Sequence, residues 1–132
     1  MRLKSFNLSL GSQIFKACSD ESRLRILHLI FENEEMCISD LEKILEFTQT
    51  KTSRHLTYLK NSGILTFRRH NHWVFYAIKD EVYEILKQIF QFLRKDQLLQ
   101  KDQQLYQTLF SNRELAVNKM KMGEWHKPGI TT

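Results

Sequence analysis

The stretch from residue 48 to residue 78 constrains the fold most, because a helical pattern there gives way to two β-rich runs. A helix is predicted from Gln49 to about Asn61, with Thr48 as its cap and Gly63 in the left-handed position after its end. Two β-rich runs then bracket a short polar turn at residues 70–72, which predicts a hairpin. A helix followed directly by a hairpin is typical of a helix-turn-helix with a wing.

Helical periodicity also appears in the first third of the chain. It predicts one helix over about residues 9–18 and a second helix capped at residue 19 or 20. A short apolar piece at residues 36–38 has the composition of a minimal strand. The capping-box pattern at residues 39–42 predicts the start of a third helix, which ends near Glu46. The expected fold class is therefore mainly α with a small β-hairpin wing, a winged helix-turn-helix.

The segment that begins at Asp80 predicts one long amphipathic helix of about 30 residues. Its apolar stripe consists of Val82, Ile85, Leu86, Ile89, Phe90, Leu93, Leu98, Leu105 and Leu109. One small domain rarely covers so long a stripe, so we expect a partner chain to do so. A further short helix, capped near Ser111, is expected to reach Met122. The predicted organisation is residues 1–111 as a winged helix-turn-helix domain with a long C-terminal dimerisation helix, and residues 112–132 as a short helix and flexible tail.

Charge is unevenly distributed along this chain of 132 residues, whose net charge is +5. Residues 48–79 contain six Lys or Arg and no acid, whereas residues 20–46 contain eight acids and three bases. A one-sided basic surface fits a polyanion, and we predict double-stranded DNA as the partner. The candidate contacts to base edges and phosphates in a major groove are Gln49, Thr50, Lys51, Ser53 and Arg54. The candidate contacts at the wing tip are Arg68, Arg69 and His70.

Several other classes of protein find no support in the sequence. No apolar run approaches the roughly 20 residues of a membrane span, and the N-terminus lacks the pattern of a signal peptide. Two cysteines do not make a disulfide framework, so a cytoplasmic setting is expected. No nucleophile motif or phosphate-binding glycine loop is present, so we expect neither an enzyme nor a cofactor. His70 and His72 lack an apparent third ligand, so no metal site is expected.

Three motifs in order resemble the ArsR/SmtB family of bacterial winged-helix repressors. Residues 15–27 resemble the family's entry into its second helix, residues 53–65 its recognition helix and exit, and residues 68–76 its wing. The resemblance covers about residues 14–89. It implies a homodimer built on the first and last helices and repression by operator binding. In many members it also implies release from DNA by a metal or by thiol chemistry.

This sequence departs from the family's pattern at the residues that sense metal ions. The arsenic-type site uses Cys-x-Cys followed by Asp, but here Ser39 stands in place of the second thiol after Cys37. Zinc-sensing relatives place His along the last helix, and residues 80–110 contain neither His nor Cys. We therefore predict that neither arsenite nor zinc is sensed in the usual way. Cys18 and Cys37 are either small buried hydrophobes or candidate redox thiols. The alternatives are a thiol-redox repressor, a regulator without a small effector, and a winged-helix protein-interaction module without DNA binding.

Overall fold

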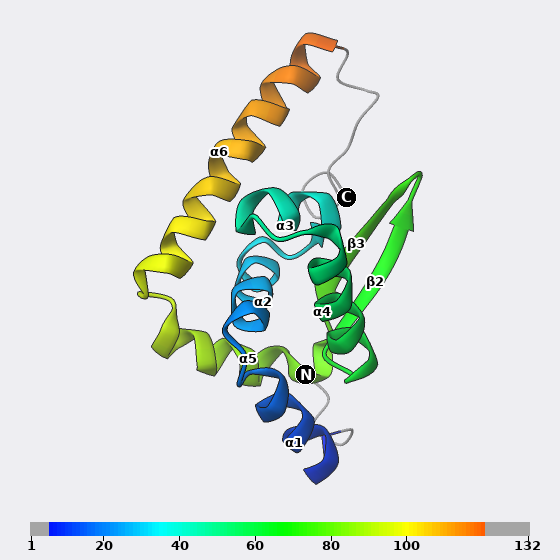
Figure 1. Ribbon diagram of the computed structural model, residues 1–132, viewed down its shortest axis with the longest axis vertical. Helices are drawn as coiled ribbons and strands as arrows, with labels where there is room; N and C mark the ends of the chain where they lie inside the picture. The colour runs from blue at the N-terminus through cyan, green and yellow to red at the C-terminus, as the bar shows by residue number, and fades with distance from the viewer. Residues whose placement is uncertain (1–5, 121–132) are drawn as a thin grey trace.

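The structure is a computed structural model that describes residues 6–120, with the side chains of residues 6–111. Six helices and three strands lie in this described part (Figure 1). The helices are α1 (Leu8–Ala17), α2 (Glu21–Asn33), α3 (Ile38–Leu45), α4 (Gln49–Asn61), α5 (Asp80–Leu93) and α6 (Gln97–Met120). The strands are β1 (Met36–Cys37), β2 (Leu65–His70) and β3 (Trp73–Ile78). The expected fold class, a winged helix-turn-helix, is confirmed.

The helix boundaries around the helix-turn-helix follow from side-chain caps. Asp20 Oδ1 accepts a hydrogen bond of 3.0 Å from the Arg23 amide at the start of α2. Thr48 Oγ1 does the same for the Lys51 amide at the start of α4, at 3.1 Å. Gly63 adopts a φ of 83° after the end of α4, a conformation that costs glycine little. The predicted bounds of α4 are therefore confirmed.

The predicted capping box at the start of α3 is wrong. The helix begins at Ile38, and Cys37 occupies the cap position without a side-chain cap hydrogen bond. Cys37 is also the last residue of β1, where it pairs with Phe75, so the chain passes directly from strand into helix. Ser39 consequently lies inside the first turn, with its Oγ 3.4 Å from Cys37 Sγ, and it does not cap α3.

The wing is part of a three-stranded antiparallel sheet with the order β1-β3-β2. The hairpin pairs β2 with β3 from Leu65 opposite Ile78 to His70 opposite Trp73, and Asn71 takes a positive φ of 57° in the turn. The two-residue strand β1 pairs with the middle of β3. The base of the wing is thereby fixed to the connection between α2 and α3, a pairing that the sequence pattern did not indicate.

The single helix expected from Asp80 is wrong, because the chain forms two helices. Asp96 lies at the break, and its Oδ1 accepts from the amides of Leu98 at 2.8 Å and Leu99 at 3.4 Å. Aspartate side chains compete with the helical backbone and favour such cap positions. The helix α6 continues through Ser111 to Met120, so no separate short helix starts there. The stop expected near Met122 and the tail after it lie outside the described residues.

After the break, α6 turns back along α2 and α3 (Figure 1). Asp102 is bound to Arg25 of α2, and Gln103 exchanges two amide hydrogen bonds of 2.8 Å with Asn33. Leu99 and Tyr106 are buried at this contact. Of the predicted stripe, Val82, Leu86 and Phe90 are buried within the chain, whereas Leu98 and Leu105 of α6 are each 42% exposed. None of the described helices is long and apolar enough to cross a bilayer.

Candidate nucleic-acid interface

The buried face of α4 determines which of its residues point outward. Thr52, Leu56 and Leu59 are fully buried, and Thr52 Oγ1 also donates to the Thr48 carbonyl oxygen at 2.8 Å. The predicted contact residues lie on the remaining faces. Gln49, Thr50 and Arg54 are exposed, whereas Lys51 and Ser53 are half-buried. The structure thus places all five predicted α4 residues at or near the surface.

The first turn of α4 carries the positive end of the helix dipole on its backbone amides. It contains no acidic residue. The Lys51 ammonium lies 3.9 Å from the centre of the Phe47 ring, in the turn just before the helix. Arg54 has no ion-pair partner among residues 6–111, so its charge is available to an anion. This arrangement suits the binding of phosphate groups.

His55 faces inward and belongs to the core side of α4. Its side chain is buried, and this burial is the main cause that lowers its pKa, with the charge of Asp20 acting in the opposite direction. The imidazole is therefore neutral at pH 7. His55 supports the helix and does not belong to the candidate surface, as its place in the helical pattern indicated.

Thr57 was missed in the sequence analysis and shares the outward face of α4. It is exposed, seven residues after Thr50 and three after Arg54, a spacing that places all three on one side of a helix. The helical spacing of Thr50, Arg54 and Thr57 can be recognised in the sequence. The exposed face therefore extends over at least two turns of α4.

The two arginines of the wing lie on opposite faces of β2, because side chains alternate along a strand. Arg68 Nε is 3.0 Å from Glu35 Oε1, and its guanidinium also lies over the Phe75 ring. Arg69 shares the other face with Phe67, whose ring is 5.2 Å from the Lys60 ammonium of α4. Arg69 therefore lies on the face of the wing that is turned toward α4, whereas Arg68 lies on the other face and is paired with Glu35.

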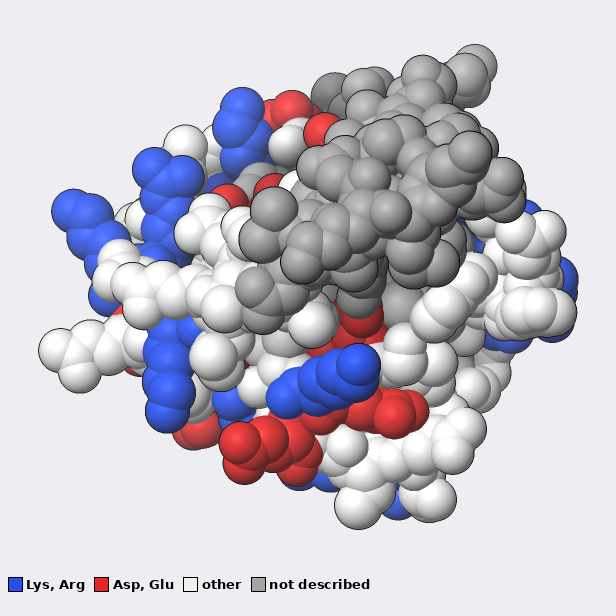
Figure 2. Space-filling model, turned by 90° about the horizontal axis from the view of Figure 1, so that it is seen from above, with Lys and Arg blue, Asp and Glu red and all other residues white. Residues whose placement is uncertain are grey.

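The Glu35 contact modifies the charge argument made from the sequence. Glu35 comes from the connection between α2 and β1, so an acid does reach the otherwise acid-free wing. Figure 2 shows that acidic side chains also lie close to basic ones on the visible face at one end of the molecule. Lys and Arg lie mainly toward two opposite edges of the visible face, and Asp and Glu lie mainly between them, with Lys or Arg among them (Figure 2). His70, at the end of β2, is exposed.

The two cysteines lie in environments that favour the protonated thiol. Burial raises the pKa of the Cys37 thiol, and the charge of Asp40 raises it further. Burial also raises the pKa of Cys18, against the lowering effect of Arg23. A thiol is most reactive as a thiolate, so neither environment activates the group. Among the described residues, no group of three or more His, Cys, Asp or Glu side chains is placed to hold a metal ion.

Comparisons with known proteins give a consistent result. The family model "Bacterial regulatory protein, arsR family" matches residues 20–66, from the cap of α2 to the second residue of β2. An arsenic resistance transcriptional regulator of Pseudomonas putida is 42% identical over 69 residues, which cover 52% of this chain and 54% of that protein. The chain thus spans about half the length of this curated relative, and 60% of the length of the arsenical resistance operon repressor of Escherichia coli.

A third relative is matched over most of its length. An uncharacterized HTH-type transcriptional regulator of Methanocaldococcus jannaschii is 42% identical over 78 residues, which cover 58% of this chain and 88% of that protein. Among solved structures, the homodimeric winged helix-turn-helix DNA-binding domain of a possible ArsR-family regulator from Mycobacterium bovis superposes with a TM-score of 0.58. It is 25% identical and covers 69% of this chain and 83% of its own. The chain belongs to the arsR family of bacterial regulatory proteins.

Proposed function

We propose that the chain is a homodimeric transcriptional repressor that binds double-stranded DNA at specific sites. The observation that carries the proposal is the outward face of α4, which is polar and basic, lies beside the wing and contains Arg54, a residue without an ion-pair partner among residues 6–111. A helix of this kind fits into a major groove, and a dimer with twofold symmetry would read a roughly palindromic site. Support comes from the E. coli relative, which is named an operon repressor, and from the M. bovis domain, which is named homodimeric and DNA-binding.

Within this proposal the predicted contact residues have different roles. Gln49, Thr50 and Ser53 have short or neutral polar side chains suited to base edges, while Lys51 and Arg54 supply charge to bases or phosphates. Thr57 extends the same face. At the wing, Arg69 and His70 contact the DNA backbone or a minor groove. Arg68 mainly orders the wing through Glu35, because its charge is already partly neutralised.

The dimer interface in this proposal is formed by α1 and α5. These helices lie at the same end of the molecule (Figure 1) and carry the most exposed large apolar side chains. Leu8 and Phe15 of α1 are 90% and 66% exposed, and Phe92 of α5 is 84% exposed. An exposed apolar patch of this kind marks an interaction surface. Leu93, one of the stripe residues expected to be covered by a partner chain, is partly buried against the core of its own chain.

DNA binding is tested with a labelled duplex from the promoter of the chain's own operon, by fluorescence anisotropy over a series of salt concentrations. Arg54→Ala and Arg69→Ala should each weaken binding about tenfold and reduce the salt slope by about one unit. Lys101→Ala is the matched control, because it removes one exposed positive charge from α6, away from α4 and the wing. Equal effects of all three substitutions, or no binding by the wild type, would overturn the proposal.

The dimer is tested by sedimentation at micromolar concentration. Phe92→Glu places a charge on the exposed apolar surface of α5 and should yield a folded monomer. Leu105→Glu is the control, because Leu105 is another exposed large apolar residue, at 42%, but belongs to α6. A wild-type protein that is folded and monomeric would contradict the proposed interface.

A further inference from the structure

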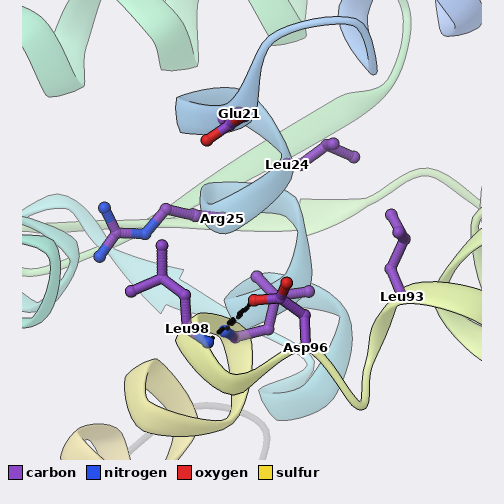
Figure 3. Close-up of a pocket in the computed structure, with 7 residues that line it drawn as sticks. Glu21, Leu24, Arg25, Leu93, Asp96 and Leu98 are labelled. Atoms are coloured by element: carbon purple, nitrogen blue, oxygen red, sulfur yellow. Dashed lines mark hydrogen bonds between the residues drawn. The ribbon is translucent and has the colours of Figure 1, made fainter.

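A cavity lies at the junction of α5 and α6, against the first turns of α2 (Figure 3). Its volume is about 410 Å³. Small-molecule sites in proteins typically occupy about 300–1,000 Å³, are mostly apolar, and contain a few placed polar groups. The lining residues are Glu21, Leu24, Arg25, Leu93, Asp96, Leu98 and Leu99. The cavity exists because Asp96 breaks the helix, which turns α6 back and leaves a space inside the bend.

The charges around this cavity do not balance. Of its three charged residues, Arg25 is already bound by Asp102, whose two carboxylate oxygens accept from Nε and Nη2 at 3.0 Å each. Glu21 is exposed and has no ion-pair partner among residues 6–111. Asp96 uses Oδ1 to cap α6 and likewise has no cationic partner there. Counting Asp102, three carboxylates therefore lie around one guanidinium, and the space lined by four leucines is net negative.

We propose that this cavity binds a small apolar organic cation, such as an alkylammonium compound. The apolar part lies among leucines of all three helices, of which Leu24 and Leu93 point toward each other across the cavity in Figure 3. The cationic group lies near Glu21 and Asp96. Burial of the apolar part supplies most of the affinity, and the two carboxylates supply the preference for positive charge.

The wall of the cavity is connected to the first turn of α4. The Arg25 guanidinium lies 5.5 Å from the centre of the Phe47 ring, and the Lys51 ammonium lies 3.9 Å from the same ring. Arg25 both lines the cavity and contacts Asp102 and the Phe47 ring, so a bound molecule lies against the residue that joins the cavity to α4. We infer that occupancy of the cavity weakens DNA binding, an inference that rests on the function proposed above.

Binding is tested first without DNA, by following leucine methyl shifts of the full-length protein on titration with hexyltrimethylammonium. Hexanesulfonate and 1-hexanol serve as the anionic and neutral probes of similar apolar size. The cation should bind saturably and about fivefold tighter than either, because exposed ion pairs contribute modestly. The double variant Glu21→Gln with Asp96→Asn should abolish this preference, and asparagine retains the cap of α6.

The control variant is Asp80→Asn with Glu84→Gln. It likewise removes one aspartate and one glutamate charge, but from the exposed surface of α5 outside the cavity. It should bind the cation as the wild type does. Absence of a saturable shift, or equal affinity for the three probes, would overturn the cavity as a cation site.

The second measurement is duplex affinity with and without the cation. Saturating cation should weaken duplex binding of the wild type several-fold, and the Glu21→Gln, Asp96→Asn variant should need about fivefold more cation for the same effect. Saturable cation binding with unchanged duplex affinity would overturn the regulatory part of the inference. Failure of the repressor proposal itself is seen separately, as an absence of duplex binding before any cation is added.

Discussion

Removal of Arg25 should destabilise the fold more than neutralisation of its partner, Asp102. The two side chains form a bidentate ion pair with both distances at 3.0 Å, but they are buried unequally. The Asp102 side chain is 1% exposed and the Arg25 side chain is 21% exposed. Arg25→Ala therefore leaves a carboxylate with almost no access to water, whereas Asp102→Asn leaves a guanidinium that water can still reach.

The magnitude of the Arg25→Ala effect has a limit set by proton uptake. A stranded buried charge costs about 3–5 kcal/mol, but a carboxylate can avoid that cost by binding a proton. For an ordinary aspartate, protonation costs about 4 kcal/mol at pH 7 and about 1.5 kcal/mol at pH 5. We therefore expect Arg25→Ala to lower the free energy of unfolding by about 3–4 kcal/mol at pH 7 and by about 1.5 kcal/mol at pH 5. Asp102→Asn should cost about 1–2 kcal/mol at both pH values.

The assay is urea unfolding followed by far-ultraviolet circular dichroism, at one fixed protein concentration because dimerisation contributes to stability. Each variant is compared with the wild type at the same pH. The double variant Arg25→Ala with Asp102→Leu should be more stable than Arg25→Ala alone, since no charge is then left unpaired. A penalty for Arg25→Ala that equals that of Asp102→Asn, or that does not fall at pH 5, would refute the reasoning.

Three further outcomes are expected. Burial lowers the pKa of His28 despite the nearby Glu32, so the unfolded state binds its proton more readily and stability should fall as the pH drops below about 6.5. Urea unfolding at several pH values checks this, and His28→Leu should make the fall shallower. Gly63→Ala should cost about 1 kcal/mol in the same assay, because its φ is positive while its added methyl meets only an ordinary contact with Leu10. Glu35→Gln should free Arg68 and so strengthen duplex binding and raise the salt slope by about one unit in anisotropy titrations. An unchanged slope would show that Arg68 lies away from the DNA.

The recognition helix and the wing were predictable because their signals are local. Thr48 at the cap, Gly63 after the end and the spacing of the buried residues between them determine the bounds of α4 without reference to the rest of the chain. The hairpin likewise follows from two β-rich runs around a short turn. Local patterns of this kind specify elements well when the tertiary structure does not oppose them.

The errors arose where distant residues decide the structure. The apolar stripe continues across the break between α5 and α6, so periodicity alone could not show that α6 turns back. Asp96 was the available signal, as a residue that favours caps. The pairs Arg25–Asp102 and Glu35–Arg68 join residues that are 77 and 33 positions apart. No local pattern in the sequence predicts such pairings.

The position of α6 also bears on the regulation proposed above. Cys37 is a poor candidate, because its thiol is buried, its pKa is raised, and its neighbour at 3.4 Å is the hydroxyl of Ser39. Soft metal ions and arsenite are held by two or three thiolates, and Cys37 has a hydroxyl where the second thiol would be. The junction of α5 and α6 is a better candidate for two reasons. It lines a half-open cavity, and its Arg25 lies over the same Phe47 ring as Lys51 of α4. A change in the docking of α6 therefore reaches the proposed DNA-binding face through two side-chain contacts, whereas a change at Cys37 has no comparable chemistry to start it.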